Sequence, residues 1–275
     1  MTDASTATRA RKRAGLSLTA IVVTALVLLG GVVAVVIAHQ ATAPEPVPAA
    51  PAASTAPTTP PTSSGTDGAT AESTLAARPM VQLPAQAAQP QAMTTATAGP
   101  AITVPKPTAT TGRWIPDGFP DTPEGALGQL KALDETAMTA ADPQIYARGV
   151  HELAEPGAPD PGSTGLSTLL TSLRARAQLP ATGPVPGLSA SYQVTHGQIK
   201  GVTPDGRYVV VCVLGQFSVG VNGQLVSAGV GDCQAMRWTG TQWRIASGAL
   251  AAPAPCAWPG SADAVKAGYR ELRGG

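Results

Sequence analysis

Tyr208–Trp238 reads YVVVCVLGQFSVGVNGQLVSAGVGDCQAMRW and contains the strongest strand and turn signals of the chain. Two runs rich in apolar and β-branched residues flank Asn222-Gly223, the dipeptide that most strongly favours a two-residue hairpin turn. With these two residues as the turn, Val209 lies opposite Met236, and successive side chains alternate between the faces of a sheet. The sequence therefore predicts a long antiparallel hairpin whose register can be checked residue by residue.

The same register places Cys212 opposite Cys233, at a non-hydrogen-bonded position of the hairpin. Opposed Cα atoms at such positions are about 4.5–5.5 Å apart, which lies within the range of a disulfide. In an oxidising compartment this geometry favours a Cys212–Cys233 bridge, which would stabilise the fold by roughly 3 kcal/mol. Cys256 lies in a Pro- and Ala-rich stretch and is the alternative partner for either cysteine.

Two further strands are expected beside the hairpin, at 188–202 and 243–247, with Gly240-Thr241 as a second tight turn. Most of the large apolar side chains then fall on one face, and a wetter face is expected opposite. The wetter face would carry Tyr208, Gln216, Ser218, Arg237 and Arg244.

Asp232 and Gln234 depart from this pattern because the register puts both polar side chains on the apolar face. A β-bulge adds one residue to a strand and reverses the faces beyond it, and glycine is common at such positions. We therefore expect a bulge near Gly229 or Gly231.

Helix signals dominate the chain before the sheet. Thr122-Pro123 and Asp142-Pro143 each combine a capping side chain with proline at the first helical position. Apolar residues at helical spacing follow both, and a third such run begins at Leu166 and ends before Pro180. A short C-terminal helix is expected from Ser261, with an apolar stripe at Val265, Tyr269 and Leu272.

This order of elements predicts an α+β fold over residues 113–275. Three helices would pack on a four-stranded antiparallel sheet, with the short helix at the C-terminus. In element order this plan is similar to the cystatin-like architecture of the nuclear transport factor 2-like superfamily.

The N-terminal region predicts a membrane anchor. Residues 16–38 are almost wholly apolar, and about 23 residues at ~1.5 Å each span a bilayer. Arg9, Arg11, Lys12 and Arg13 lie in the preceding tail, residues 1–15, which the positive-inside rule keeps in the cytoplasm. We therefore expect a single-pass protein of the cell membrane with an extracytoplasmic C-terminal domain. The alternative is a signal peptide cleaved after Ala41-Thr42-Ala43.

Residues 39–112 are rich in Pro, Ala, Thr, Ser and Gln and contain few large apolar side chains. Such a composition buries too little surface to offset the entropy of ordering the chain. The sequence therefore predicts a disordered linker that lets the folded domain work away from the bilayer.

The ionisable residues show no catalytic or metal-binding pattern. The net charge of +1 gives no general attraction for nucleic acid, so no direct nucleic-acid binding is expected. His39, His151 and His196 have no partner ligand at metal-binding spacing, and no phosphate-binding glycine loop is present. We expect no enzyme activity, no catalytic residues and no cofactor or metal.

One enzyme class shares the predicted layout. Sortases combine an anchor, a linker and an exported β-rich domain with His, Cys and Arg, which His151, Cys233 and Arg244 would supply here. Val230-Gly231-Asp232 precedes the cysteine, where sortases have Thr-Leu-x-Thr. A Cys233 bonded to Cys212 could not act as the nucleophile.

Three motifs in 113–275 resemble membrane-anchored proteins of actinobacterial conjugative elements. They are Gly118–Ala126 (GFPDTPEGA), Asp232–Trp238 (DCQAMRW) and Trp258-Pro259-Gly260 with Ala267–Arg270 (AGYR). The layout is similar to TcpC-type conjugation proteins and to the inner-membrane assembly subunit of type IV secretion systems. That resemblance implies an exported nuclear transport factor 2-like domain that oligomerises as a scaffold. TcpC-type proteins carry two such domains, whereas one is expected here.

Two hypotheses for function follow. The first is a non-enzymatic membrane scaffold in a conjugation or type IV secretion-like transfer complex, with the lipid bilayer, other envelope or channel proteins and further copies of itself as partners. The second is a tethered binding module whose sheet face holds a small ligand or cell-wall material. An open apolar pocket between sheet and helices, in place of a filled one, would favour the second.

Overall fold

The protein folds as a mixed α+β structure, described by a computed structural model for residues 64–221 and 223–275. In chain order the elements are α2 (Ser64–Ala77), η1 (Ala85–Ala88), β1 (Ile102–Val104), α3 (Pro123–Ala137), α4 (Pro143–Leu153), η2 (Pro161–Ser163), α5 (Gly165–Arg176), β2 (Leu188–Val202), β3 (Tyr208–Val221), β4 (Gln224–Trp238), β5 (Trp243–Ile245), α6 (Ala262–Lys266) and β6 (Arg270–Gly274).

The strands form one curled sheet in the order β1-β6-β2-β3-β4-β5, so the expected four strands are extended to six. The predicted hairpin register is confirmed: Val209 pairs with Met236, and Val221 pairs with Gln224 across the two turn residues. The register of the next turn is also confirmed, with Trp238 opposite Trp243.

The expectation of a β-bulge in β4 is wrong. Pairing between β3 and β4 is continuous from Tyr208–Arg237 to Val221–Gln224. The shifts in register lie in β2, between Val194 and His196 and between Ile199 and Gly201. Asp232 and Gln234 therefore stay on the face that carries the main core, as two buried polar side chains.

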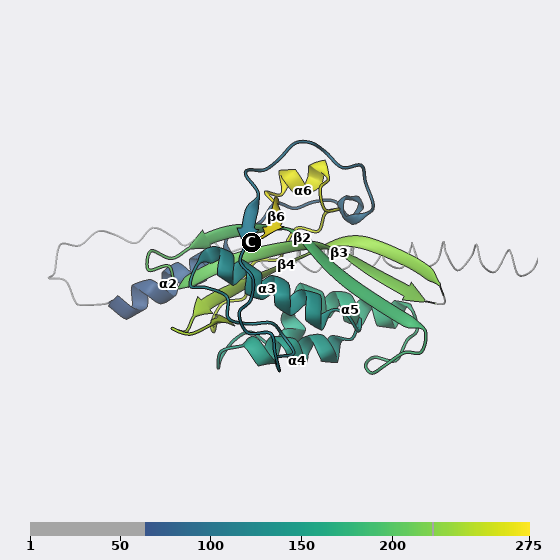
Figure 1. Cartoon of the computed structure of the whole chain (residues 1–275), viewed down its shortest axis with the longest axis horizontal. Helices are drawn as coiled ribbons and strands as arrows, with labels where there is room; N and C mark the ends of the chain where they lie inside the picture. The colour runs from purple at the N-terminus through teal and green to yellow at the C-terminus, as the bar shows by residue number, and fades with distance from the viewer. Residues whose placement is uncertain (1–63, 222) are drawn as a thin grey trace, which may run out of the picture.

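Three helices, α3, α4 and α5, cover that face of the sheet (Figure 1). Their start signals act as expected: the Thr122 side chain accepts from the Gly125 N–H and the Asp142 side chain from the Gln144 N–H. Leu127, Leu130 and Leu133 of α3 are fully buried and pack over the central strands. The predicted helices of the main core are thus confirmed.

The opposite face was expected to be wetter, and this expectation holds only in part: Gln216, Arg237 and Arg244 are partly exposed, whereas Tyr208 and Ser218 are buried. Figure 1 shows α6 and the chain around η1 on the side of the sheet away from α3, α4 and α5. A second apolar cluster there joins side chains of β3 and β4 to the early chain and to residues 249–257. Its members include Leu75, Leu83, Ala87, Tyr208, Val210, Cys212, Leu214, Cys233, Ala257 and Tyr269.

Residues 64–112 consequently belong to the fold, although they were expected to be part of the disordered linker 39–112. Leu75 of α2, Leu83, and Ile102 and Val104 of β1 are all buried. Ala76, Ala87 and Ala88 are buried as well, because small side chains let the backbone approach the sheet closely. Leu75, Leu83, Ala76 and Ala87 belong to the second cluster, and Ala88, Ile102 and Val104 belong to the main core.

Residues 249–257, here called the crossing segment, lie directly on β4. A Cβ at Gly229 would stand 1.8 Å from the Ala257 carbonyl oxygen, and one at Gly231 would stand 2.6 Å from the Pro255 carbonyl oxygen. The two glycines, expected to mark a bulge, instead provide the space that this close approach needs.

The C-terminal helix is shorter than expected. Ser261 caps α6, as predicted, by accepting from the Ala264 N–H at 3.2 Å. Gly268 then adopts φ +89°, a conformation that ends a helix, and the chain continues as β6. β6 pairs antiparallel with β2 and parallel with β1, so Leu272 contributes to a strand and not to a helical stripe.

The predicted cytoplasmic tail, the predicted span at 16–38 and residues 39–63 of the predicted linker lie outside the described residues. Within 64–221 and 223–275, no helix combines the length and the apolar character needed to cross a membrane.

Candidate functional site

A cavity of about 540 Å³ opens beside the middle of β4. Its walls are residues 230–234 of β4, residues 162–169 at η2 and the start of α5, and the crossing segment from Leu250 to Cys256. β5 pairs with β4 at Met236–Trp238, beyond residues 230–234, which have β3 on one side and line this cavity. We call this space the β4 cavity.

Most of the surface area that lines the β4 cavity is apolar. The aliphatic residues and proline among its members are Ala77, Leu166, Leu169, Val230, Leu250, Ala251, Ala252, Pro253 and Ala254. Leu166 and Leu169 are buried at the base of α5, whereas Leu250 at the opening is 38% exposed. A pocket of a few hundred Å³ with an apolar wall and a few polar groups is typical of small-molecule sites.

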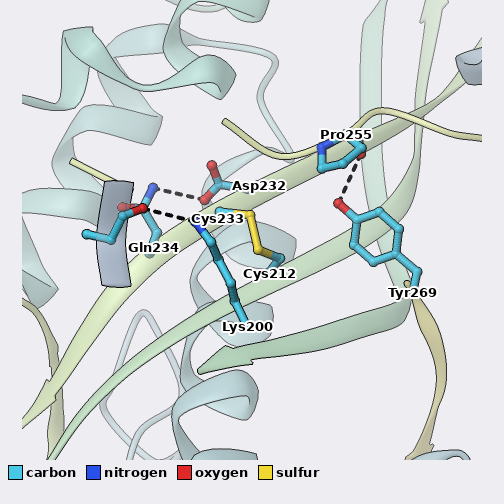
Figure 2. Close-up of a disulfide and its surroundings, with 8 residues drawn as sticks. Lys200, Cys212, Asp232, Cys233, Gln234, Pro255 and Tyr269 are labelled. Carbon is cyan, nitrogen blue, oxygen red and sulfur yellow. Dashed lines mark hydrogen bonds between the residues drawn. A yellow bond between two sulfur atoms is a disulfide. The ribbon is translucent and has the colours of Figure 1, made fainter. Parts of the chain in front are cut away.

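Asp232 and Gln234 supply the charged and amide groups of the wall. Gln234 Nε2 donates to Asp232 Oδ2 at 3.0 Å, and both side chains point to the same side of β4 (Figure 2). Burial raises the pKa of Asp232 to about 6, and hydrogen bonds from Gln234 and the Cys233 backbone oppose that rise. None of the ion pairs found in the described part of the chain includes Asp232.

A second buried acid lies within electrostatic reach of Asp232. Asp134 of α3 is fully buried, and neither of its carboxylate oxygens has a hydrogen-bond partner within the described residues. Burial, followed by the charges of Asp232 and Glu135, raises the pKa of Asp134 well above its usual value. The region behind the cavity wall is therefore rich in acidic groups and strongly disfavours further negative charge.

Tyrosines surround the same acids. The Tyr192 hydroxyl donates to the carbonyl of Val230, two residues before Asp232 in β4, at 2.7 Å. Burial raises the pKa values of Tyr146 and Tyr192 well above the usual value, and the charges of Asp134 and Asp232 raise them further. Both tyrosines therefore stay neutral at physiological pH and add no negative charge beside the acids.

The predicted disulfide is confirmed: Cys212 and Cys233 are bridged, with Cα atoms 4.1 Å apart (Figure 2). Cys256 is the free, buried cysteine among the described residues and lines the β4 cavity. Burial raises the pKa of the Cys256 thiol, with the Gly231 backbone opposing the rise, so the thiolate is disfavoured.

The residues of the sortase-like hypothesis do not make a nucleophilic site. Cys233 is in the disulfide, so it has no thiol to attack a substrate. His151 is exposed on α4, and Arg244 Nη1 donates to the Glu152 carbonyl. The bridge thus removes the nucleophile that this hypothesis requires.

The histidines that the structure describes are likewise dispersed. His196 of β2 is partly buried, and this burial lowers its pKa, while Glu271 on the neighbouring strand acts in the opposite direction. Within residues 64–221 and 223–275, no three His, Cys, Asp or Glu residues are grouped to hold a metal ion. His39 lies outside the described residues.

Sequence reasoning did not identify the β4 cavity. Its walls come from α5, β4 and a Pro- and Ala-rich segment without periodicity, which only the folded chain brings together. One signal was present: Asp232 and Gln234 stood on the apolar face of a well-determined register. Polar residues in such positions mark either an irregular strand or a site, and here they mark the wall of a cavity.

Comparison of the chain with protein-family models, with curated proteins and with solved structures finds no match in any of the three. The resemblance to conjugation proteins therefore stays a prediction.

Proposed function

We propose that the protein is a binding module that holds a small, largely apolar ligand in the β4 cavity. The observation that carries this proposal is the cavity itself, with about 540 Å³ of space and an apolar wall interrupted by Asp232 and Gln234. An open pocket between the sheet and the helices distinguishes a binding module from a domain in which side chains fill all the space between them.

The surroundings of the cavity support this function because they hold its walls in place. The Cys212–Cys233 disulfide joins β3 to β4 beside the polar wall residues. On the opposite wall, Thr164 caps α5 by accepting from the Ser167 N–H at 3.2 Å, so the start of the helix is well defined. A site on rigid elements binds with a smaller loss of conformational entropy.

The predicted anchor gives this module a place of action. With a span at 16–38 and a cytoplasmic N-terminus, the ligand would be met outside the cytoplasmic membrane. An oxidising compartment is also where a structural disulfide persists, and this agrees with the bridge at Cys212 and Cys233.

Filling the cavity tests the proposal. Thr168→Phe places a ring into the β4 cavity from α5, and Thr171→Phe makes the same change on an exposed position of the same helix. We expect benzyl alcohol, a neutral apolar probe, to shift the NMR signals of residues 162–169 and 230–234 in the wild-type protein and in Thr171→Phe. Thr168→Phe should weaken binding at least about tenfold. Equal binding by both variants, or no saturable shift at these residues, would contradict the proposal.

The scaffold role in a conjugation or secretion-like transfer complex stays a separate prediction, and ligand binding is compatible with it. Affinity isolation of the full-length chain from membranes tests this role directly. Recovery of channel or ATPase subunits of a transfer complex would support it, and their absence from repeated isolations would count against it.

A further inference from the structure

We propose that the β4 cavity selects organic cations, namely ligands that join one protonated amine to an apolar body, with Asp232 as the counter-ion. This inference rests on the proposed binding function and specifies the chemical class of its ligand.

Asp232 has the position that a counter-ion needs. It lines the cavity and is only 4% exposed, so a charged ligand group beside it would be shielded from bulk water. Its hydrogen-bond donors, the Gln234 amide at 3.0 Å and the Cys233 backbone, are neutral. These donors orient the carboxylate without cancelling its charge.

The other titratable groups near Asp232 do not cancel its charge either. They come from every element packed around it: Asp134 of α3, Tyr146 of α4, Tyr192 of β2, Cys256 of the crossing segment and Tyr269 before β6. Each of these groups is either neutral or negative. A cation is therefore the charge that this environment favours, whereas an anion would meet like charges in a poorly solvated site.

The buried cations of the domain are engaged elsewhere. Arg174 pairs with Asp142 at 3.4 Å and donates to the Ala141 carbonyl at 2.7 Å. Lys200 donates to the Ala76 carbonyl at 3.0 Å, at the end of α2, as Figure 2 shows. A cationic ligand would therefore meet no competing protein cation at Asp232.

The rest of the cavity specifies the body of the ligand. Leu166, Leu169 and Val230 form buried apolar wall, and Leu250 extends that wall to the opening. A ligand with its amine at Asp232 would place its carbon skeleton against these side chains. An apolar amine satisfies both parts of the wall at once, whereas an inorganic cation would leave the apolar part uncovered.

The experiment compares benzylamine, benzyl alcohol and benzoate, which share one apolar body and carry a positive, zero and negative charge at pH 7.5. The full-length chain in lipid nanodiscs is titrated by calorimetry, with empty nanodiscs as the blank for partitioning. We expect benzylamine to bind at least about tenfold more tightly than benzyl alcohol, and benzoate to bind more weakly than either. This preference should shrink at pH 5, because Asp232, with a pKa of about 6, is then mostly protonated.

Asp232→Asn is the deciding variant, since the amide keeps the shape of the side chain and loses its charge. We expect it to abolish the preference for benzylamine and to leave the affinity for benzyl alcohol within about twofold. The matched control is Asp121→Asn, an exposed acid before α3, which should behave as the wild-type protein does. If Asp232→Asn fails to fold, the wild-type protein supplies the test. The ratio of its affinities for benzylamine and benzyl alcohol is then compared between pH 7.5 and pH 5.

Equal affinities for benzylamine and benzyl alcohol at both pH values would overturn the inference and leave the binding function intact. Tighter binding of benzoate would overturn it in the same way. Failure of all three probes to bind would contradict the binding function as well.

Discussion

The two faces of the sheet are covered in different ways. On the face of the main core, helices with large apolar residues at helical spacing pack on the strands, as Leu127, Leu130 and Leu133 of α3 illustrate. On the other face, α2, the chain around η1, the crossing segment and α6 lie close to the strands with small residues such as Ala76, Ala87 and Ala257. We call these the helical face and the small-residue face.

This difference shows that a segment of low sequence complexity need not be disordered. A segment without periodic large residues cannot make a core of its own. It can still complete one when the strands already present an apolar face, because the strands supply most of the buried area. The predictions below test how far the fold depends on the early chain and how the two faces differ in electrostatics.

The largest effect is expected from removal of residues 64–112. Leu75, Leu83, Ile102 and Val104 would be lost, and each buried side chain of this size contributes roughly 1.5–3 kcal/mol. Their sum approaches the whole free energy of unfolding of an average domain, so fragment 113–275 should be unfolded or aggregated. Circular dichroism and size-exclusion chromatography, with fragment 64–275 as the control, measure this. A cooperative unfolding transition of 113–275 at the temperature found for 64–275 would show that the early chain is dispensable.

The next largest loss of stability is expected when the buried ion pair between Arg174 of α5 and Asp142 is broken. Arg174 is 1% exposed, pairs with Asp142 and donates to the carbonyls of Ala141, Pro180 and Gly183. Arg174→Met leaves a buried carboxylate without its cation, which should lower the free energy of unfolding by about 3–5 kcal/mol. Urea denaturation measures the change. Arg176→Met, an exposed change on the same helix, should have little effect; a similar loss in both variants would refute a special role for the buried pair.

Replacement of Asp232 should change the free energy of unfolding by a smaller amount and in the opposite direction. Its pKa is raised from 3.8 to about 6 in the folded protein, so the folded state binds more protons than the unfolded state between these values. Stability therefore falls as pH rises through this range, by about 3 kcal/mol for the single group. Asp232→Asn should be more stable than the ligand-free wild-type protein at pH 7.5, and the difference should disappear below about pH 4. Thermal unfolding across this pH range tests the sign, and a wild-type protein that gains stability from pH 5 to pH 7.5 relative to the variant would disprove it.

The smallest effect belongs to the ion pairs that attach α2. Arg237 donates to Glu72 at 2.6 and 2.9 Å and to Glu155 at 3.2 Å, but it is 28% exposed. Arg237→Gln should lower the free energy of unfolding by about 1 kcal/mol or less, since partly exposed pairs contribute little. Hydrogen exchange should quicken in α2 more than in α3, α4 and α5. Uniform quickening, or a change equal to that in the exposed variant Arg207→Gln, would argue against local attachment.

The hairpin and the starts of the main helices could be predicted because they depend on local chemistry. A two-residue turn and a period of two determine every pair from Tyr208–Arg237 to Val221–Gln224, and the disulfide follows from the same geometry. Thr122 and Asp142 define helix starts through hydrogen bonds within a few residues.

The missed elements depend on contacts between distant parts of the chain. β1 and β6 are short strands whose pairing partners lie far apart in the sequence, and Leu272 suits a helix or a strand equally well. The cavity was missed for the same reason, since α5, β4 and the crossing segment meet only after folding. Asp232 was noticed, but sequence alone could not tell a strand irregularity from a side chain that lines a site.

Gly229 and Gly231 let the crossing segment lie close to β4, and this segment forms one wall of the β4 cavity. The crossing segment rests on these two positions, and its residues 250–256 form one wall of the cavity. A methyl group at Gly231 would stand 2.6 Å from the Pro255 carbonyl oxygen and 2.7 Å from the Tyr269 hydroxyl, so the crossing segment would have to shift. Under the proposed binding function, substitutions at these two glycines would change the width of the cavity and keep Asp232 in its wall.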